Sequence, residues 1–474
     1  MTTAIVVGSG PNGLAAAVRL AQAGVDVTVL EAAAEIGGGT RTAELTLPGL
    51  LHDVCSAIHP FSIVSPYFSS LPLADAGLEW RWPDVELAHP LDDGRAGVLL
   101  RSLERTADGL GSDGRAWSRL FGPLSRALPT IAHEAFQPVL HLPRYPVTFA
   151  AFGLRALQPA TWTARRFCTD EARALWAGCA AHVIHPLSRP LTSSVALMLL
   201  AAGHAVGWPV AAGGSRSITD ALAQLLTRAG GRIETGIEVT TFDEVGAADV
   251  VVFDVAPSAL VRIAGDHLPR RVTHSLRRWR HGPAVFKLDL AVDGGVPWAN
   301  EACRRAGTVH VGGTLEEVAH AEAEVHAGRM PARPFVLVGQ QYLADPSRSR
   351  DDAHPVWAYA HVPRGFTGDA AKAILSQIER FAPGVRDRIL ATCVHTPDDY
   401  ASYNANYVGG DIATGANDPA QLLFRPRIAL DPYATGIPGV FLCSAATPPG
   451  AGVHGMCGAN AAGSALRYLA RAAK

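Results

Sequence analysis

The first thirty residues combine two short apolar runs with one amphipathic stretch between them. The run Ala4–Val7 has the length and content of a buried parallel strand. Residues 12–23 have helical spacing, and Gly24 is placed to end that helix. A second apolar run, Val27–Leu30, completes a strand–helix–strand unit. This pattern predicts an α/β fold built on a parallel sheet.

A similar pattern returns in the middle of the chain. Residues 217–229 have helical spacing, and Ser217 is a candidate cap for the helix. The apolar positions of this helix are Ile218, Leu222, Leu225 and Leu226. Strand patterns follow at 232–234 and 237–241, and a buried strand is predicted at 250–255. Because these elements arrive so late, the parallel-sheet domain is predicted to be discontinuous.

A second domain is indicated by alternating apolar and polar residues from position 281 onward. The stretch "GPAVFKLDLAVDG" predicts a strand of a second sheet, and "PFVLVGQQYL" and "VWAYAHV" predict further short strands. Residues 90–204 have a helical pattern and form a predicted insert. We therefore assign residues 1–89, 205–280 and 415–474 to the Rossmann-like domain, and residues 90–204 and 281–414 to an α+β substrate domain.

Composition narrows the function classes. The 474 residues carry a net charge of -2, which gives no reason to expect a nucleic-acid partner. The seven cysteines are scattered without a CxxC or zinc spacing, so we expect no metal and a reducing, cytoplasmic environment. No apolar run is long enough to span a bilayer. The oligomeric state is left undetermined.

The first turn carries a dinucleotide signature. Gly8, Gly10 and Gly13 form GxGxxG around Pro11 and Asn12, at the junction of the predicted strand and helix. The glycines permit a tight turn, close approach of a pyrophosphate and close packing of helix on sheet. Glu31, at the end of the second strand, is placed to accept hydrogen bonds from a ribose diol. The order of these parts predicts a dinucleotide site.

A second glycine segment, "AAAEIGGGTRT", favours FAD over NAD. Gly38, Gly39 and Thr40 allow another close approach of backbone to ligand, and Arg41 supplies a cation for the pyrophosphate. An NAD site does not need this segment; the alternative is a surface loop. We also include Val239, from the predicted strand 237–241, among the cofactor contacts.

Five stretches together resemble the phytoene-dehydrogenase-like FAD oxidoreductases, within the amine-oxidase and carotenoid-desaturase group. They are "GSGPNGL", "GGGTRT", "HPLDDGRAGVLLRSLERTADGLG", "GPAVFKLDLAVDGGVPW" and "FLCSAATPPGAGVHGMCGANAA". The resemblance covers nearly the whole chain. It implies a glutathione-reductase-type FAD domain beside a substrate domain of sheet and helices.

The resemblance also implies that the C-terminal glycine-rich turn passes along the flavin. The residues that would contact the cofactor there are Ser444, Gly452, Val453 and His454. The strand 439–446 would lead into this turn, and a helix starting near 453–456 would point its N-terminus at the N1–C2=O edge. Ala451 and Ser444 depart from glycines that are common in the family, so local contacts are expected to differ.

Candidate catalytic residues are fewer. Lys287 lies within the apolar strand "AVFKLDLAV" and could hold a water or substrate group near the flavin, or be a snorkelling or salt-bridged lysine. His454 could contact substrate or be structural, and His59 is a weaker candidate. Tyr400, Tyr403 and Tyr407 could line a cavity or form part of the core.

The segment 135–166 of the insert mixes large apolar residues with Arg144, Arg155, Arg165 and Arg166. It could contact a membrane surface peripherally, line the mouth of an apolar tunnel, or be a helical cap with solvated arginines.

The function that these residues favour is an FAD-dependent oxidoreductase. It would desaturate a largely apolar small molecule by hydride transfer to flavin N5. A redox-neutral double-bond isomerase, an amine oxidase and a non-enzymatic flavin-bearing interaction protein are the alternatives. The absence of aromatic residues from "TPPGAGVHG" weighs against an amine oxidase.

Overall fold

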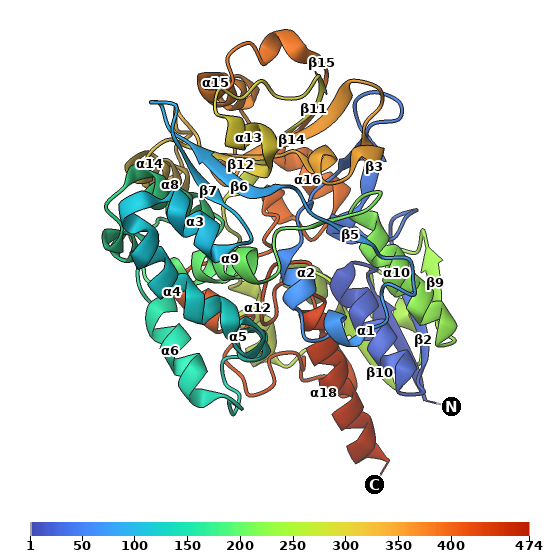
Figure 1. Ribbon diagram of the computed structural model, residues 1–474. Coiled ribbons are helices and arrows are strands. Elements are labelled where there is room, and N and C mark those ends of the chain that lie inside the picture. The colour runs from blue at the N-terminus through green and yellow to red at the C-terminus, as the bar shows by residue number, and fades with distance from the viewer. Residues whose placement is uncertain (1, 474) are drawn as a thin grey trace.

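The computed structural model describes residues 2–473, in which two sheets are joined through a helical insert (Figure 1). The first is a five-stranded sheet of order β16-β10-β1-β2-β9, and every neighbouring pair is parallel. Its strands are β1 (Thr3–Val7), β2 (Asp26–Glu31), β9 (Arg232–Thr235), β10 (Val250–Phe253) and β16 (Val440–Leu442). This sheet confirms the predicted parallel α/β domain and its discontinuity.

Helices cover both faces of the parallel sheet, because its apolar strands are buried on both sides. One face packs against α1 (Pro11–Gln22), α10 (Arg216–Arg228) and α18 (Met456–Ala472). The other face packs against α11 (Pro257–Ala264) and α12 (Arg270–Arg277). The result is the three-layer arrangement of doubly wound folds.

Two local predictions in this domain are wrong. Residues 237–241 form no strand; the amide of Ile237 donates to the Glu31 carbonyl, but the chain then leaves the sheet edge. Ser217 does not cap α10, because its hydroxyl donates to the Ala212 carbonyl and Ser215 occupies the cap position. The apolar face of α10 is buried as predicted.

The second sheet has seven strands in the order β15-β11-β14-β13-β12-β6-β7. Its pairs are antiparallel except for β6 with β12. The strands are β6 (Val85–Pro90), β7 (Ala96–Leu99), β11 (Ala284–Asp293), β12 (Ala306–Val311), β13 (Val336–Gly339), β14 (Ala353–Val362) and β15 (Ile389–His395). The domain boundary predicted at residue 89 therefore falls inside β6, which pairs with this second sheet.

The insert after β7 is helical, as predicted, and shares an apolar core with the second sheet. Its helices are α3 (Leu103–Gly109), α4 (Gly114–Arg126), α5 (Leu128–Ala135), α6 (Pro146–Ala156), α7 (Ala160–Thr163), α8 (Asp170–Ala181) and α9 (Ser193–Ala205). In Figure 1 the labelled helices of this insert lie on the left of the molecule, across from α1 and α18 at lower right. Within residues 2–473, no helix has the length and apolar content that a membrane span requires.

Two further two-stranded antiparallel pairs and six α-helices complete the fold. One pair joins β3 (Thr42–Glu44) to β4 (Leu51–Asp53), and the other joins β5 (Trp80–Arg81) to the distant β8 (Val210–Ala211). The remaining helices are α2 (Pro60–Val64), α13 (Glu301–Arg305), α14 (Leu315–His326), α15 (Ala371–Phe381), α16 (Pro397–Tyr403) and α17 (Pro419–Leu423).

Candidate functional site: a dinucleotide cavity

One cavity of about 1360 Å³ runs from the glycine loop of the parallel sheet to the helical insert and the second sheet. This exceeds the roughly 300–1,000 Å³ typical of a site for one small ligand, so it has room for a cofactor and a substrate. The predicted cofactor residues that line it are Gly8, Gly10, Pro11, Asn12, Glu31, Gly38, Gly39, Thr40, Arg41, Val239, Ser444, Gly452, Val453 and His454. The glycine-rich segments at the two ends of the chain thus border one space.

The glycine loop leaves no room for side chains. Gly8 has φ +104°, and a Cβ on Gly13 would lie 2.0 Å from the Gly8 carbonyl oxygen. Gly13 does not line the cavity; it brings α1 against the loop, which is the packing role predicted for the third glycine. At Gly39, a Cβ would lie 2.1 Å from the Tyr407 hydroxyl.

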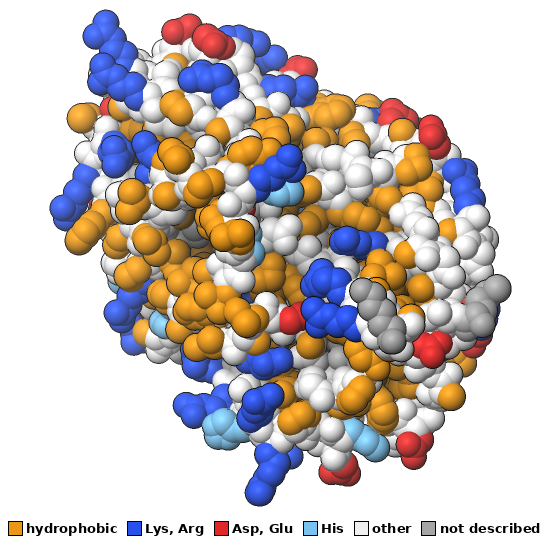
Figure 2. Space-filling model, turned by 90° about the horizontal axis from the view of Figure 1, so that it is seen from below, with side chains coloured by type: hydrophobic (Ala, Val, Ile, Leu, Met, Phe, Trp, Pro, Cys, Tyr) orange, Lys and Arg blue, Asp and Glu red, His pale blue; other side chains and the backbone are white. Residues whose placement is uncertain are grey.

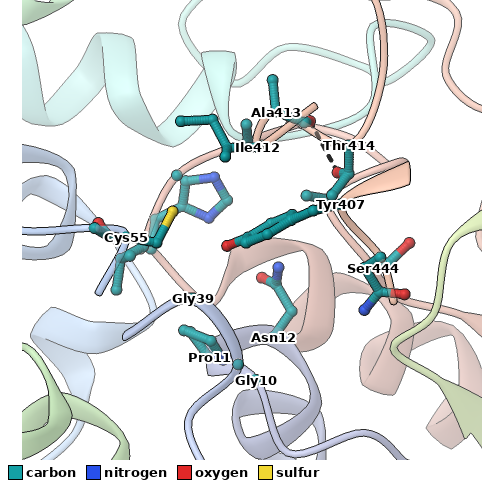
Figure 3. A pocket seen from close by; sticks show the side chains of 18 of the residues that line it. Gly10, Pro11, Asn12, Gly39, Cys55, Tyr407, Ile412, Ala413, Thr414 and Ser444 are labelled. Atoms are coloured by element: carbon teal, nitrogen blue, oxygen red, sulfur yellow. Dashed lines mark hydrogen bonds between the residues drawn. The ribbon is translucent and has the colours of Figure 1, made fainter. Parts of the chain in front are cut away.

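Helix α1 presents its N-terminus to this space. Its cap residue is Gly10, no side chain caps it, and its first turn carries no acidic residue. An uncapped N-terminus favours an anion such as a pyrophosphate. Asn12 Oδ1 and Ser444 Oγ are buried without a hydrogen-bond partner, and Figure 3 shows both side chains beside the same space. The N-terminus of α1 and the unpartnered oxygens of Asn12 and Ser444 are groups that a bound dinucleotide would contact.

Glu31 braces the glycine loop. Its Oε2 accepts hydrogen bonds from the Ser9 amide (2.8 Å) and hydroxyl (2.6 Å), and its Oε1 accepts one from the Ala33 amide (2.9 Å). The Glu31 carboxylate also lines the cavity, where a bound dinucleotide could reach it. Its hydrogen bonds with a ribose diol stay a prediction.

Arg41 lies at the cavity wall between the two domains. Its guanidinium donates to the Glu35 carbonyl (2.8 Å) and stacks 5.2 Å from the Tyr403 ring centre. Of the three tyrosines that could line a cavity or form part of the core, Tyr403 and Tyr407 line the cavity. Tyr400 does not line it and belongs to the apolar core. In Figure 3 the Tyr407 ring lies across the space between Asn12 and Thr414.

Asp254 is a site residue that the sequence reasoning missed. It follows β10 directly, lines the cavity, and accepts a hydrogen bond from the Gly13 amide (2.8 Å). Burial, with a smaller effect from the charge of Glu31, raises the pKa of Asp254 to about 7. A protonated carboxyl here would lessen repulsion of an anionic ligand. The signal was an acidic residue at the carboxyl end of a buried parallel strand.

Helix α18 begins at Met456, within the predicted range 453–456, after Gly455 at φ +64°. The strand predicted over 439–446 is shorter, because β16 ends at Leu442. His454 is buried, and its Nδ1 accepts a hydrogen bond from the Met456 amide (3.1 Å). Burial lowers the pKa of His454 to about 4, against the opposing effect of a hydrogen bond to the Gly450 backbone. The neutral imidazole therefore shapes the turn while one side borders the cavity.

Arg425 is a second missed residue, and nothing in its local sequence indicated it. Its side chain is buried, lines the cavity, and donates to the Ala445 carbonyl (3.0 Å) and to Asn417 Oδ1 (2.9 Å). Its Nε has no partner, and within residues 2–473 no carboxylate forms an ion pair with it. A buried cation with neutral partners favours an anion nearby.

The structure contradicts Lys287 as a catalytic residue. Lys287 does not line the cavity. Its fully buried Nζ donates to Asp289 (2.7 and 2.8 Å) and to the carbonyls of Asp53 (2.8 Å) and Val54 (3.0 Å). All its donors are used within the protein, so the salt-bridged interpretation is confirmed.

Three features define the class of protein to which this site belongs. They are a Rossmann-type sheet, an α1 without a side-chain cap beneath a glycine loop, and a second glycine-rich turn on the same cavity. This combination of fold and site belongs to the FAD-dependent oxidoreductases, and FAD is the cofactor that the site fits.

Known proteins share sequence with this chain at low identity. Residues 6–70 match the NAD(P)-binding Rossmann-like domain family. The mouse pyridine nucleotide-disulfide oxidoreductase domain-containing protein 2 is 25% identical, across 98% of this chain and 93% of the mouse protein. The uncharacterized protein Rv0897c of Mycobacterium tuberculosis is 24% identical, across 98% and 97%.

Solved structures share the whole fold. An oxidoreductase from Methanosarcina mazei superposes with a TM-score of 0.63 at 16% identity, covering 98% of this chain and 100% of that one. Putrescine oxidase bound to putrescine gives 0.60 at 18% identity, covering 100% and 99%. Cyclohexylamine oxidase from Brevibacterium oxydans gives 0.57 at 16% identity, again covering 100% and 99%. At these identities the likeness establishes the fold.

Proposed function

We propose that this protein is an FAD-dependent dehydrogenase that desaturates a largely apolar organic molecule, as its resemblance to the phytoene-dehydrogenase-like enzymes implies. The observation that carries the proposal is the continuity of the cavity. It leads from the dinucleotide loop into a chamber walled by apolar side chains of the insert. These are Phe136, Val139, Phe149, Phe152, Leu191, Val195, Met198 and Leu199.

FAD, when bound, supplies a two-electron acceptor that can take a hydride from a substrate held against it. The residues of this chain would bind and orient. Gly10, Asn12 and Ser444 would hold the cofactor, and the apolar walls would exclude water and press the substrate toward it. The buried cation of Arg425 would favour negative charge in that part of the cavity.

Amine oxidation is the second candidate, favoured by the shared fold with putrescine oxidase and cyclohexylamine oxidase. The cavity itself supports it less. The carboxylates that line the cavity are Glu31, Glu238 and Asp254, and all three follow strands of the parallel sheet or lie at its edge. The apolar chamber between α6 and α9 offers an ammonium group no such partner.

We further propose that the apolar substrate enters from a membrane surface on which the protein docks. Large apolar side chains are exposed around α6, where the cavity opens beside Val139 and Leu157. They are Val139, Leu140, Leu142, Tyr145, Val147, Leu154, Leu157 and Trp162. Figure 2 shows hydrophobic side chains gathered on the left of this face, with Lys and Arg side chains around them. Exposed arginines beside apolar groups match an anionic lipid surface.

The test is the absorbance spectrum of the purified protein, followed anaerobically during addition of phytoene in micelles, putrescine or cyclohexylamine. We expect a flavin spectrum that the polyene bleaches and the amines do not. Bleaching by an amine alone would replace desaturation with amine oxidation. A flavin that no compound bleaches, with the polyene isomerised after prior reduction, would favour the isomerase. No flavin band after addition of FAD would overturn the proposal.

A further inference from the structure

The second sheet has one apolar face and one face rich in polar groups. In β14, Val356, Ala358 and Ala360 pack into an apolar core with α15, whereas Trp357 and Tyr359 point to the opposite side, toward the insert. Side chains alternate between the faces of a strand, so this division follows from the sequence "VWAYAHV". The insert side of the sheet is the wall of the cavity.

Neighbouring strands extend the polar face. The register places Thr308 of β12 opposite Gly339 of β13, and Gly339 opposite Trp357 of β14. Tyr359 occupies the adjacent row, opposite Leu337. Residues in one row of a sheet point to the same face. Thr308, Leu337, Trp357 and Tyr359 all line the cavity.

Two polar atoms on this wall have no partner. Thr308 Oγ1 and Trp357 Nε1 are buried and make no hydrogen bond. Their side chains are 2% and 7% exposed. A buried polar group without a partner costs about 1–3 kcal/mol, so native proteins rarely keep two of them in one row of a sheet without a use.

A histidine of the insert contacts this face of the sheet through His310, which lies two residues from Thr308 on β12. His182 lines the cavity, and its Nε2 lies 3.0 Å from Nε2 of His310, which is fully buried on β12. Within residues 2–473 the other ring nitrogen of His182 makes no hydrogen bond. Behind this pair, on the same face of the sheet, His361 binds Glu322 (2.7 Å). Burial lowers the pKa of His182 to about 3, so this imidazole is neutral.

Charged groups next to this wall are already paired. Lys287, 5.8 Å from the Trp357 ring centre, is bound to Asp289, and Asp289 also faces His52 and His395. The wall therefore offers neutral groups. Trp357 Nε1 can only donate a hydrogen bond, while the Thr308 hydroxyl and the neutral His182 can donate or accept.

From these contacts we infer that Thr308, Trp357 and His182 form a subsite for a neutral oxygen group, a carbonyl or a hydroxyl, at one end of an otherwise apolar substrate. This inference rests on the proposed function and names its substrate class. Anchoring the oxygen on the sheet would fix which carbon of the apolar body lies toward the dinucleotide end of the cavity. Thr308, Trp357 and His182 are thus specificity-determining residues.

Binding of three compounds with the same ring skeleton tests the inference. 1-Tetralone carries a carbonyl, tetralin carries no polar group, and 1-aminotetralin carries an ammonium group. Each is measured by displacement of the fluorescent apolar probe N-phenyl-1-naphthylamine from the full-length protein. We expect 1-tetralone to bind about 10-fold more tightly than tetralin and 1-aminotetralin, as one or two added hydrogen bonds allow.

Two variants and a control test whether the preference for 1-tetralone comes from Thr308 and Trp357. Thr308→Val and Trp357→Phe should each reduce the preference for 1-tetralone over tetralin about 3- to 10-fold and leave tetralin affinity unchanged. Thr227→Val, on the exposed surface of α10, should change neither value. Thr308→Val should also keep or raise the thermal unfolding midpoint, because it removes an unpaired buried hydroxyl, whereas loss of a structural hydroxyl would lower it.

Equal affinity of the wild type for all three compounds would overturn the inference, and so would tighter binding of 1-aminotetralin. An unchanged preference in Thr308→Val would overturn it even if Trp357→Phe failed to fold. The flavin content of each protein is measured in parallel. A protein without flavin that still prefers 1-tetralone would contradict the proposed function and leave the subsite standing.

Discussion

Gly13 and Gly24 show how differently two glycines of one strand–helix–strand unit are constrained. A Cβ on Gly13 would lie 2.0 Å from the Gly8 carbonyl oxygen, whereas a Cβ on Gly24 would meet nothing within 4 Å, although its φ is +83°. The first glycine is required by packing and the second only by backbone conformation.

Gly13→Ala should therefore displace α1 from the loop. We expect a cost of about 1–3 kcal/mol and at least a 10-fold loss of bound FAD. Gly24→Ala should cost about 1 kcal/mol and keep the flavin. The ratio of flavin absorbance to protein after gel filtration measures both. Full flavin content in Gly13→Ala would contradict the role given to the loop.

Single residues also show where sequence reasoning succeeds. The glycines of the loop were predicted because their function depends on spacing along a few residues. The catalytic interpretation of Lys287 was wrong because the carbonyls of Asp53 and Val54 that complete its hydrogen bonds lie 234 and 233 positions away, although its ion-pair partner Asp289 is only two residues along β11. Asp254 carried a local signal, its place directly after β10, but its hydrogen bond from the Gly13 amide spans 241 positions. Arg425 carried no local signal, and its guanidinium lies over the Trp279 ring from a distant segment.

At the scale of elements, α18 packs directly on α1 and holds the two ends of the cavity together. The Cβ of an alanine at Gly458 would lie 1.8 Å from the Asn12 carbonyl oxygen at the start of α1. Further along α18, the same atom at Gly463 would lie 3.4 Å from the end of the flexible Arg19 side chain. Only the first contact is with backbone.

Gly458→Ala should separate the two helices and lower the free energy of unfolding by about 1–3 kcal/mol or more, with loss of flavin. Gly463→Ala is the matched control in the same helix. It should be neutral or stabilise by up to about 1 kcal/mol, because alanine has the higher helix propensity. Urea unfolding followed by circular dichroism distinguishes them. Equal stabilities of the two variants would contradict this account of the helix contact.

Helices and strands with strong apolar periodicity were predicted correctly, including the strand–helix–strand unit and the long strand β11. The extended segment 237–241 was not. It has the composition of a strand, but strand pairing requires a neighbouring edge, and after Ile237 the chain leaves the edge of β2.

At the scale of the whole molecule, the exposed apolar residues around α6 predict membrane binding. The protein should sediment with vesicles that contain phosphatidylserine, and less with vesicles of phosphatidylcholine alone, because arginines flank the patch. Leu142→Asp with Val147→Asp should reduce binding at least 10-fold; these side chains are 96% and 82% exposed, so the fold should be unaffected. Leu430→Asp, at an exposed apolar residue outside this segment, is the control. Equal sedimentation of all variants would refute the docking face.

Buried histidines predict acid sensitivity. Burial lowers the pKa of His59, His89, His204 and His454 from 6.5 to about 4. Below pH 6.5 the unfolded chain binds protons at these residues and the folded chain does not. The stability they contribute is complete above pH 6.5 and is lost as the pH falls toward 4. Asp254, with a pKa raised from 3.8 to about 7, acts oppositely in this range, whereas burial also lowers the pKa of His185 to about 4 and of His182 to about 3.

Each histidine should cost about 1.4 kcal/mol per pH unit below 6.5. The four together approach the roughly 5–15 kcal/mol stability of a typical protein within one or two units. Urea unfolding at pH 7.5, 6.5 and 5.5 should show a steep fall between the last two values. In Asp254→Asn the fall should be steeper still. A flat profile from pH 6.5 to 5.5 would contradict the buried neutral state of these histidines.

The sequence by itself determined the parallel-sheet domain, the glycine loop at its first turn and a second sheet beside a helical insert. The family resemblance implied the second cofactor segment near the C-terminus. Glycine spacing and apolar periodicity are local properties, and they specify local backbone geometry. Only the tertiary structure decided that both glycine segments border one cavity, that the carbonyls of Asp53 and Val54 take up the remaining donors of Lys287, and that Asp254 and Arg425 are buried beside the site. It also decided that Thr308 and Trp357 are unpaired on the sheet wall of the cavity and that His182 lines the same cavity from the insert. These features depend on burial and on contacts between distant segments, and burial is a property of the assembled fold.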